Sequence, residues 1–104
     1  MDAADTIHHH MWDKIFRKND QIVSRKIAGD LFLVPIRGKL ADMQKIFVLN
    51  PVGEYIWEAL DNEKSLKDIC DGVAATFEVQ KEHAESDLSG FIHELLDADL
   101  IREQ

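Results

Sequence analysis

The first half of the chain carries short runs of β-branched and other apolar residues, bounded by turn residues. Residues 22–27 and 31–36 flank a glycine-containing turn, a pattern that predicts a β-hairpin. Residues 45–49 follow a polar loop and predict a third strand. Pro35 cannot donate a ladder hydrogen bond, so we expect it near a strand end. The pattern predicts a small three-stranded antiparallel sheet.

After Asn50 the apolar positions recur at three- and four-residue spacing, which is typical of helices, so we expect everything after Asn50 to be helical. Asn50 can cap a helix over residues 51–60, because its side-chain oxygen accepts a backbone N–H and Pro51 suits the first helical position. A second helix is predicted to begin at Ser65 as its cap, and a third to cover residues 80–98. Three strands followed by three helices indicate the α+β class.

The beginning of the chain has the weakest pattern. We interpret residues 1–20 as a tail, flexible or docked, and residues 21–104 as the domain. Trp12, Ile15 and Phe16 could form a short amphipathic turn on the protein's own surface, or part of a partner-binding tail. We favour docking on the protein itself.

Composition narrows the function classes. The chain has 104 residues with 20 acidic and 12 basic, giving a formal charge of -8. This excess of acids opposes binding to nucleic acid and to anionic membranes. Cys70 is the only cysteine, so the chain can form no internal disulfide and no multi-thiolate metal site. No apolar run reaches membrane-spanning length, and we expect a cytoplasmic protein.

Motifs for catalysis are scarce. The segment HELLD at residues 93–97 resembles the start of a zinc-protease helix, but Asp97 stands where the second histidine is required. His83 and Asp87 share a helix face as a solvated pair. The three histidines at 8–10 are adjacent and form no preorganised metal site. We therefore expect no enzyme, no cofactor and no metal.

The predicted third strand offers a different kind of site. If it lies at the sheet edge, its unpaired N–H and C=O groups can receive an extended peptide. The long third helix would then form one wall beside the guest. Alternatively, the segment around Trp12 covers this edge, or nothing binds there. The pattern alone does not separate these readings.

The helical half resembles the PqqD-like family, named for coenzyme PQQ synthesis protein D. The resemblance rests on an ordered set of motifs: Leu49-Asn50, Ile56-Trp57, Ser65-Leu66 with Ile69, Asp87-Leu88 with Phe91-Ile92, Leu95 and Leu100-Ile101. It implies a winged-helix-like domain that binds the leader of a ribosomally made precursor peptide. It also implies presentation of that precursor to a modifying enzyme, often a radical S-adenosylmethionine enzyme, on the way to PQQ or a related peptide-derived product.

The resemblance further implies where the leader would lie. The expected contacts are strand residues Ile46, Phe47, Val48 and Leu49, and helix residues Asp87, Leu88, Phe91 and Leu95. We expect a monomer or weak dimer. The chief alternative is a winged-helix DNA-binding or regulatory protein. Residues 80–98 contain one lysine and many acids, which argues against a DNA-recognition helix.

Overall fold

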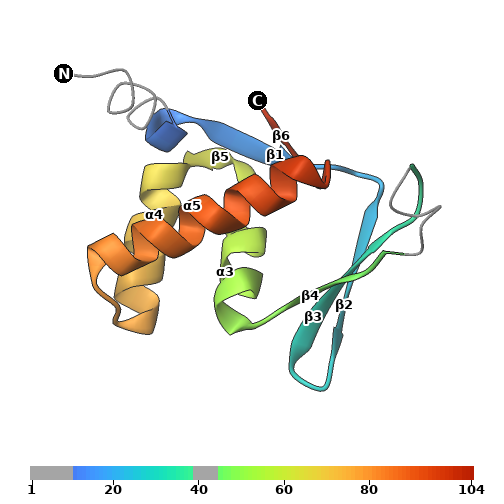
Figure 1. Ribbon diagram of the computed structural model, residues 1–104, viewed down its shortest axis with the longest axis horizontal. Helices are drawn as coiled ribbons and strands as arrows, with labels where there is room; N and C mark the ends of the chain where they lie inside the picture. Colours follow the sequence, from blue (N-terminus) through green and yellow to red (C-terminus); the bar gives the residue numbers. More distant parts are fainter. Residues whose placement is uncertain (1–10, 39–44) are drawn as a thin grey trace.

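The computed structural model describes residues 11–38 and 45–104. They form two small antiparallel sheets and a helical layer (Figure 1). In chain order the elements are β1 (Ile15–Lys18), β2 (Ile22–Ile27), β3 (Asp30–Pro35), β4 (Phe47–Leu49), α3 (Pro51–Ala59), β5 (Asp61–Ser65), α4 (Leu66–Phe77), α5 (Lys81–Asp97) and β6 (Ile101–Glu103). The predicted α+β class is confirmed.

The first sheet is the one that the sequence predicts. Its strands are ordered β2-β3-β4, and both pairs are antiparallel. Ala28 and Gly29 form the two-residue turn between β2 and β3, and both have positive φ, which matches the twist of a hairpin. Pro35 is the last residue of β3, as expected. Alternate residues of β3 are buried, so one face of the sheet packs on the core.

The predicted helices are also present, with ends shifted by a residue or so. Asn50 caps α3, since its Oδ1 accepts a hydrogen bond from the Gly53 N–H at 2.8 Å. Ser65 caps α4, and its Oγ accepts from the Asp68 N–H at 3.3 Å. Pro51 occupies the first turn of α3, where its missing N–H leaves no partner unsatisfied.

The expectation that everything after Asn50 is helical is wrong. β5 and β6 flank β1 in a second antiparallel sheet of order β5-β1-β6. β5 has the polar sequence DNEKS and β6 has only three residues, so neither shows the apolar alternation of a half-buried strand. Both are strands because β1, far away in sequence, supplies the backbone partners.

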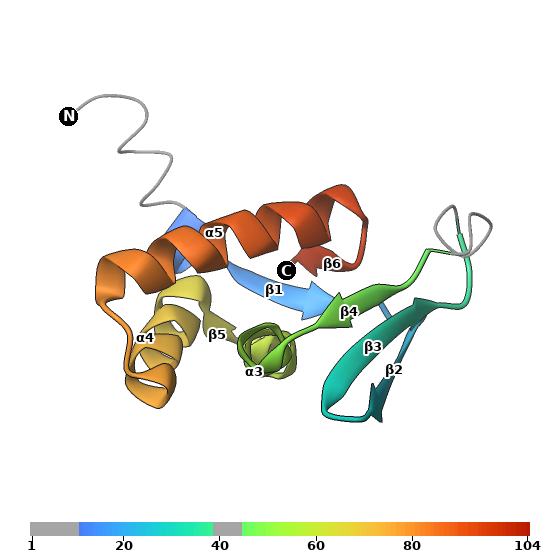
Figure 2. The same cartoon turned by 60° about the horizontal axis from the view of Figure 1, so that its bottom comes forward.

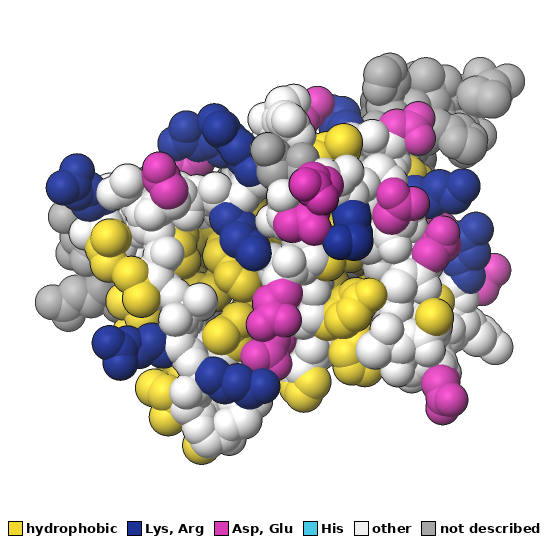
Figure 3. Space-filling model, turned by 180° about the vertical axis from the view of Figure 1, so that it is seen from behind, with side chains coloured by type: hydrophobic (Ala, Val, Ile, Leu, Met, Phe, Trp, Pro, Cys, Tyr) yellow, Lys and Arg dark blue, Asp and Glu magenta, His cyan; other side chains and the backbone are white. Residues whose placement is uncertain are grey.

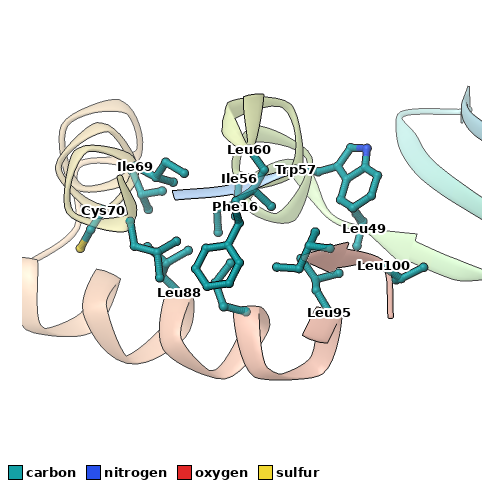
Figure 4. Packing of buried hydrophobic residues seen from close by; sticks show 14 of the residues in the cluster. Phe16, Leu49, Ile56, Trp57, Leu60, Ile69, Cys70, Leu88, Leu95 and Leu100 are labelled. Atoms are coloured by element: carbon teal, nitrogen blue, oxygen red, sulfur yellow. The ribbon is translucent and has the colours of Figure 1, made fainter. Parts of the chain in front are cut away.

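β1 also corrects the expectation of an amphipathic turn at Trp12, Ile15 and Phe16. Residues from Ile15 onward form a strand, and Phe16 is buried at 3% exposure. Figure 4 shows its ring beside Leu88 and Leu95 of α5 and Ile56 of α3. This part of the segment therefore docks on the protein itself, as favoured, and does so as a strand in the core.

Polar contacts at the end of β1 hold the two layers together. The Lys18 ammonium lies 5.5 Å from the ring centroid of Trp57 on α3. Burial lowers the pKa of Lys18, although the carboxylates of Glu58 and Asp61 act in the opposite direction. Asn19 then donates through its side-chain amide to the Asp99 carbonyl at 2.9 Å. The two contacts join residues that are 39 and 80 positions apart in the sequence.

Two further features bear on function. Cys70 is buried, and burial raises the pKa of its thiol, which keeps the sulfur protonated and weakly reactive. In the part of the chain that the structure describes, no helix is both long and apolar enough to cross a membrane.

Candidate functional site

β4 lies at the edge of the first sheet. Its three residues pair with β3 at Leu33↔Phe47, Phe32↔Val48 and Leu31↔Leu49. Within residues 11–38 and 45–104, β3 is its only hydrogen-bonded neighbour. The strand that follows Trp12, β1, joins β5 and β6 in the other sheet, so β1 does not pair with this edge.

A groove of about 560 Å³ lies beside this edge, between β4, α3 and α5. Figure 2 shows the arrangement, with β4 running into the end of α3 and α5 passing above both. The groove is lined by Phe47, Val48, Leu49, Asn50, Val52, Gly53, Ile56, Ser86, Asp87, Gly90, Phe91, Glu94 and Leu95. Its volume falls in the range typical of ligand-binding clefts.

The corner between β4 and α3 fixes one side of the groove. The Asn50 cap holds the first turn of α3 directly against the end of the strand. A Cβ atom on Gly53 would lie 3.3 Å from the Leu49 Cβ, so glycine permits this close approach. The hairpin is tied to the same helix by an ion pair between Lys26 Nζ and Glu54 Oε1 at 3.1 Å. Together these contacts set the position of β4 relative to α3.

One face of α5 forms the opposite wall. The residues lining it lie at 86, 87, 90, 91, 94 and 95, which is the three- and four-residue spacing of a single helix face. Gly90 lies in the middle of this wall, and a Cβ atom there would meet no other atom within 4 Å. Space is therefore open at the centre of the groove.

The charges of the groove are one-sided. Asp87 and Glu94 are the charged residues of its lining, and both belong to α5. His83 Nε2 lies 3.1 Å from Asp87 Oδ2, a contact that is an ion pair only when the imidazole is protonated. The remaining lining residues are apolar or uncharged.

The sequence of this scaffold places it in a known family. Residues 31–101 match the family model described as coenzyme PQQ synthesis protein D (PqqD). The chain belongs to the PqqD family. The match includes β3, β4 and every helix that lines the groove, and it confirms the resemblance seen in the sequence.

Solved structures share this PqqD fold. The chain is similar to a structure titled "TbiB1 in Complex with the TbiA(beta) Leader Peptide", with 27% identity and a TM-score of 0.69 over 83% of this chain and 94% of the other. It shares its fold with "Lasso peptide synthetase B1 complexed with the leader peptide", with 20% identity and a TM-score of 0.70 over 84% and 96%. No curated protein sequence matches the chain significantly.

Six of the residues predicted to bind a leader line the groove together. They are Phe47, Val48, Leu49, Asp87, Phe91 and Leu95. Two others do not line it. Ile46 precedes β4 and is exposed, whereas Leu88 points into the core and has no exposed surface. A peptide-binding role for the eight residues stays a prediction, and for Leu88 direct contact would require the core to open.

Seven lining residues were not predicted from the sequence: Asn50, Val52, Gly53, Ile56, Ser86, Gly90 and Glu94. A signal for three of them was available, because Ser86, Gly90 and Glu94 follow one another at four-residue spacing next to the predicted stripe of Asp87, Phe91 and Leu95. The α3 residues carried no such signal, since their exposure depends on how the helix is turned against β4.

His83 and His93 belong to no metal centre among the described residues, and the histidines at 8–10 lie outside those residues. His93 contacts the Ser89 carbonyl oxygen through Nδ1 at 2.8 Å, one turn earlier on the same helix. Among the described residues, no group of three or more His, Cys, Asp or Glu side chains could hold a metal ion.

Proposed function

We propose that this PqqD-family protein binds the leader segment of a ribosomally synthesised precursor peptide and presents it to a modifying enzyme. The leader adds to the edge of β4 as a further strand and lies in the groove against α5. The chain itself performs no catalytic step, and the partner enzyme is of the radical S-adenosylmethionine type. The complex acts in the cytoplasm, where ribosomes release the precursor.

The observation that carries this proposal is the open edge of β4 beside the groove. An edge strand presents N–H and C=O groups that an extended peptide can satisfy regardless of its side chains. Because β4 has three residues, only a few ladder bonds can form, each contributing ~0.5–1.5 kcal/mol. A micromolar dissociation constant corresponds to about 8 kcal/mol, so the backbone alone is insufficient.

Apolar contacts in the groove supply the difference and the specificity. Phe47, Phe91 and Leu95 line it from opposite walls, and Phe47 and Phe91 are both half-buried. Side chains that alternate along an added strand point in turn towards α5 and away from it. Every second leader residue can therefore enter the groove, which gives the protein a side-chain readout that the backbone lacks.

Relatives of known structure support the same role. TbiB1 and lasso peptide synthetase B1 were both solved as complexes with leader peptides. TbiB1 aligns with 83% of this chain and with 94% of its own length.

Charge disfavours the alternative of a DNA-binding winged helix. α5, the longest helix, carries five acidic residues and one lysine. Phosphate contacts need Lys and Arg on the element that approaches the duplex, and α5 would instead repel it. We expect no binding to duplex DNA at physiological salt.

The test uses a synthetic peptide. Its sequence is the N-terminal segment of a short precursor-like protein that is encoded beside the gene for this chain. Titration of this peptide into the isotope-labelled protein should shift the backbone resonances of β4, the first turn of α3 and the 86–95 face of α5. Shifts confined to α4, with β4 and α5 unmoved, would contradict the proposed groove.

A blocking variant gives a second, independent test. Gly90→Phe places a ring in the open centre of the groove, and the helix should tolerate it because the new Cβ meets no atom within 4 Å apart from its chain neighbours and the backbone of its own helix. Glycine within a helix is destabilising by about 0.5–1 kcal/mol relative to alanine, so the loss of Gly90 should not weaken the helix. We expect peptide binding to fall at least tenfold while the protein stays folded. His93→Phe, on an exposed part of the same helix outside the groove, is the matched control and should bind normally.

A further inference from the structure

The two walls of the groove differ in charge. β4 and α3 contribute no charged residue to its lining, whereas α5 contributes Asp87 and Glu94. No lysine or arginine lines the groove among the described residues. Any peptide bound there passes an apolar floor on one side and two carboxylates on the other.

These carboxylates are poorly neutralised by the protein. In the described part of the chain Glu94 forms no ion pair, and the ion-pair partner of Asp87 is His83, which carries charge only when protonated. Both carboxylates belong to exposed residues, so neither has been placed there to satisfy a buried cation. They are available to a ligand.

The electrostatic field around the groove is negative as well. Residues 46–104 contain fourteen acidic and four basic residues, and two of these acids, Glu82 and Glu85, precede Asp87 on α5. A field of one sign concentrates ligands of the opposite charge and raises their association rate. It also rejects ligands of like charge, which is a source of specificity.

Resting on the proposed function, we propose that the groove selects a cationic segment of the leader. Asp87 and Glu94 are seven residues apart, about 10.5 Å along the helix axis at 1.5 Å per residue. Residues i and i+4 of an added strand lie on one face about 13 Å apart. α5 and β4 slope the same way in Figures 1 and 2, so an added strand would follow the helix.

The spacing defines a pattern for the ligand. One Lys or Arg of the peptide pairs with Asp87 or with Glu94, and two such residues pair with both. An apolar residue two positions from each cation enters the groove beside Gly90 and Phe91. The long side chains of Lys and Arg bridge the difference between 10.5 and 13 Å. The recognised motif is therefore basic-x-apolar, extended to basic-x-apolar-x-basic when both carboxylates are used.

The experiment needs no knowledge of the natural precursor. A phage-displayed library of random twelve-residue peptides is selected on the wild-type protein and on the double variant Asp87→Asn, Glu94→Gln. Wild-type selection should enrich Lys and Arg two positions from an apolar residue. The double variant should retain the apolar preference and lose the basic one. For a synthetic peptide of the motif, each single variant should weaken binding about two- to fivefold, and added salt should weaken it for the wild type only.

The matched control removes equal charge from the same helix outside the groove. Glu82→Gln with Glu85→Gln should leave the basic preference intact, because neither residue lines the groove. If this control loses the preference as fully as the groove variant does, the preference comes from the general field and the assignment to Asp87 and Glu94 is wrong. Wild-type selection of neutral or acidic peptides would also overturn it.

The Gly90→Phe variant separates the two proposals. Selected peptides that no longer bind this variant occupy the groove, so an absence of basic enrichment among them rejects only the charge selection. Selected peptides that bind it as well as the wild type lie elsewhere, and that result rejects the groove and the charge selection together.

Discussion

The two described sheets of this protein each have three strands, but they are assembled in opposite ways. The sheet β2-β3-β4 comes from one stretch of chain, residues 22–49, with strands paired in sequence order. The sheet β5-β1-β6 combines segments from the beginning, middle and end of the chain, with β1 paired on both sides. Figure 1 shows them on different sides of α3.

The two sheets differ in how many strand edges they leave open. β1 has two strand neighbours and places Phe16 in the core, so this sheet closes the helical half of the protein. β4 has one described neighbour and leaves the other side of its backbone free beside the groove. Seen from behind in Figure 3, hydrophobic side chains are exposed over the hairpin side of the molecule. Among the exposed large hydrophobic residues of the molecule, Val23 and Ile27 belong to β2 and Val48 belongs to β4. One sheet holds the protein together and the other presents a surface.

The largest expected effect concerns the stability of the sheet β5-β1-β6, which we call the closing sheet. Phe16→Ala removes a buried ring between α3 and α5, and such a cavity typically lowers the free energy of unfolding by about 3–5 kcal/mol. A domain of this size has only about 5–15 kcal/mol in total, so the variant should be largely destabilised. Chemical denaturation measures this directly.

Arg17→Ala is the control on the same strand. Arg17 is exposed, so its replacement should change the free energy of unfolding by about 0.5 kcal/mol or less. Equal effects of the two variants would mean that β1 acts through its backbone pairing and that Phe16 is not the anchor we describe.

The second prediction concerns the open edge. Adjacent N–H groups of an antiparallel strand point in turn to the neighbouring strand and away from it. Of Phe47→Pro and Val48→Pro, one therefore removes a bond to β3 and the other removes an N–H that faces the groove. Proline is tolerated where an edge N–H faces outward. One of the two variants should keep its fold and lose at least tenfold in peptide affinity.

Val48→Ala serves as the side-chain control, because Val48 is 55% exposed and contributes little to the core. Its affinity for the peptide should change less than that of the folded proline variant. If both proline variants bind peptide like the wild type, or if alanine is as harmful as proline, the guest does not pair with the backbone of β4.

The same contrast explains what the sequence could predict. The hairpin, β4 and the capped start of α3 depend on neighbours in sequence, and Asn50-Pro51 together with the Ala28-Gly29 turn signalled them. β5 gave no signal, because Asp61 to Ser65 are polar and become a strand only when β1 lies beside them. In the groove, Phe91 and Leu95 were expected from the resemblance to the PqqD-like family, whereas the place of Val52 and Gly53 depended on how α3 is turned against β4.

A third prediction compares the two corners at which a strand enters a helix. Asn50 caps α3 after β4, and Ser65 caps α4 at the end of β5. Replacing either residue with alanine should lower the free energy of unfolding by about 1 kcal/mol, since each loses one cap hydrogen bond. Only Asn50→Ala should also weaken peptide binding, because its corner borders the groove. Asn50→Asp keeps the cap and should restore both properties. Weakened binding in Ser65→Ala would show instead that binding follows overall stability.

The smallest expected effect is a pH dependence located in the closing sheet. The side chain of Asp61 accepts hydrogen bonds from Lys64 Nζ at 2.9 Å and from the Glu63 N–H at 3.0 Å. The Lys64 bond is the larger cause, and together they lower the pKa of Asp61 from 3.8 to about 2. The depressed pKa means that the folded protein favours the charged carboxylate more than the unfolded chain does. The contribution of the Asp61 carboxylate to the free energy of unfolding is therefore present above pH 3.8 and is lost as the pH falls towards about 2. Because Asp61 is exposed, the effect on the free energy of unfolding should be small.

Denaturation across this pH range measures the free energies of unfolding of the wild type and of Asp61→Asn. The difference between them should be present at neutral pH and shrink on acidification. A difference that stays constant with pH would mean that Asp61 supports β5 through its geometry and not through its charge.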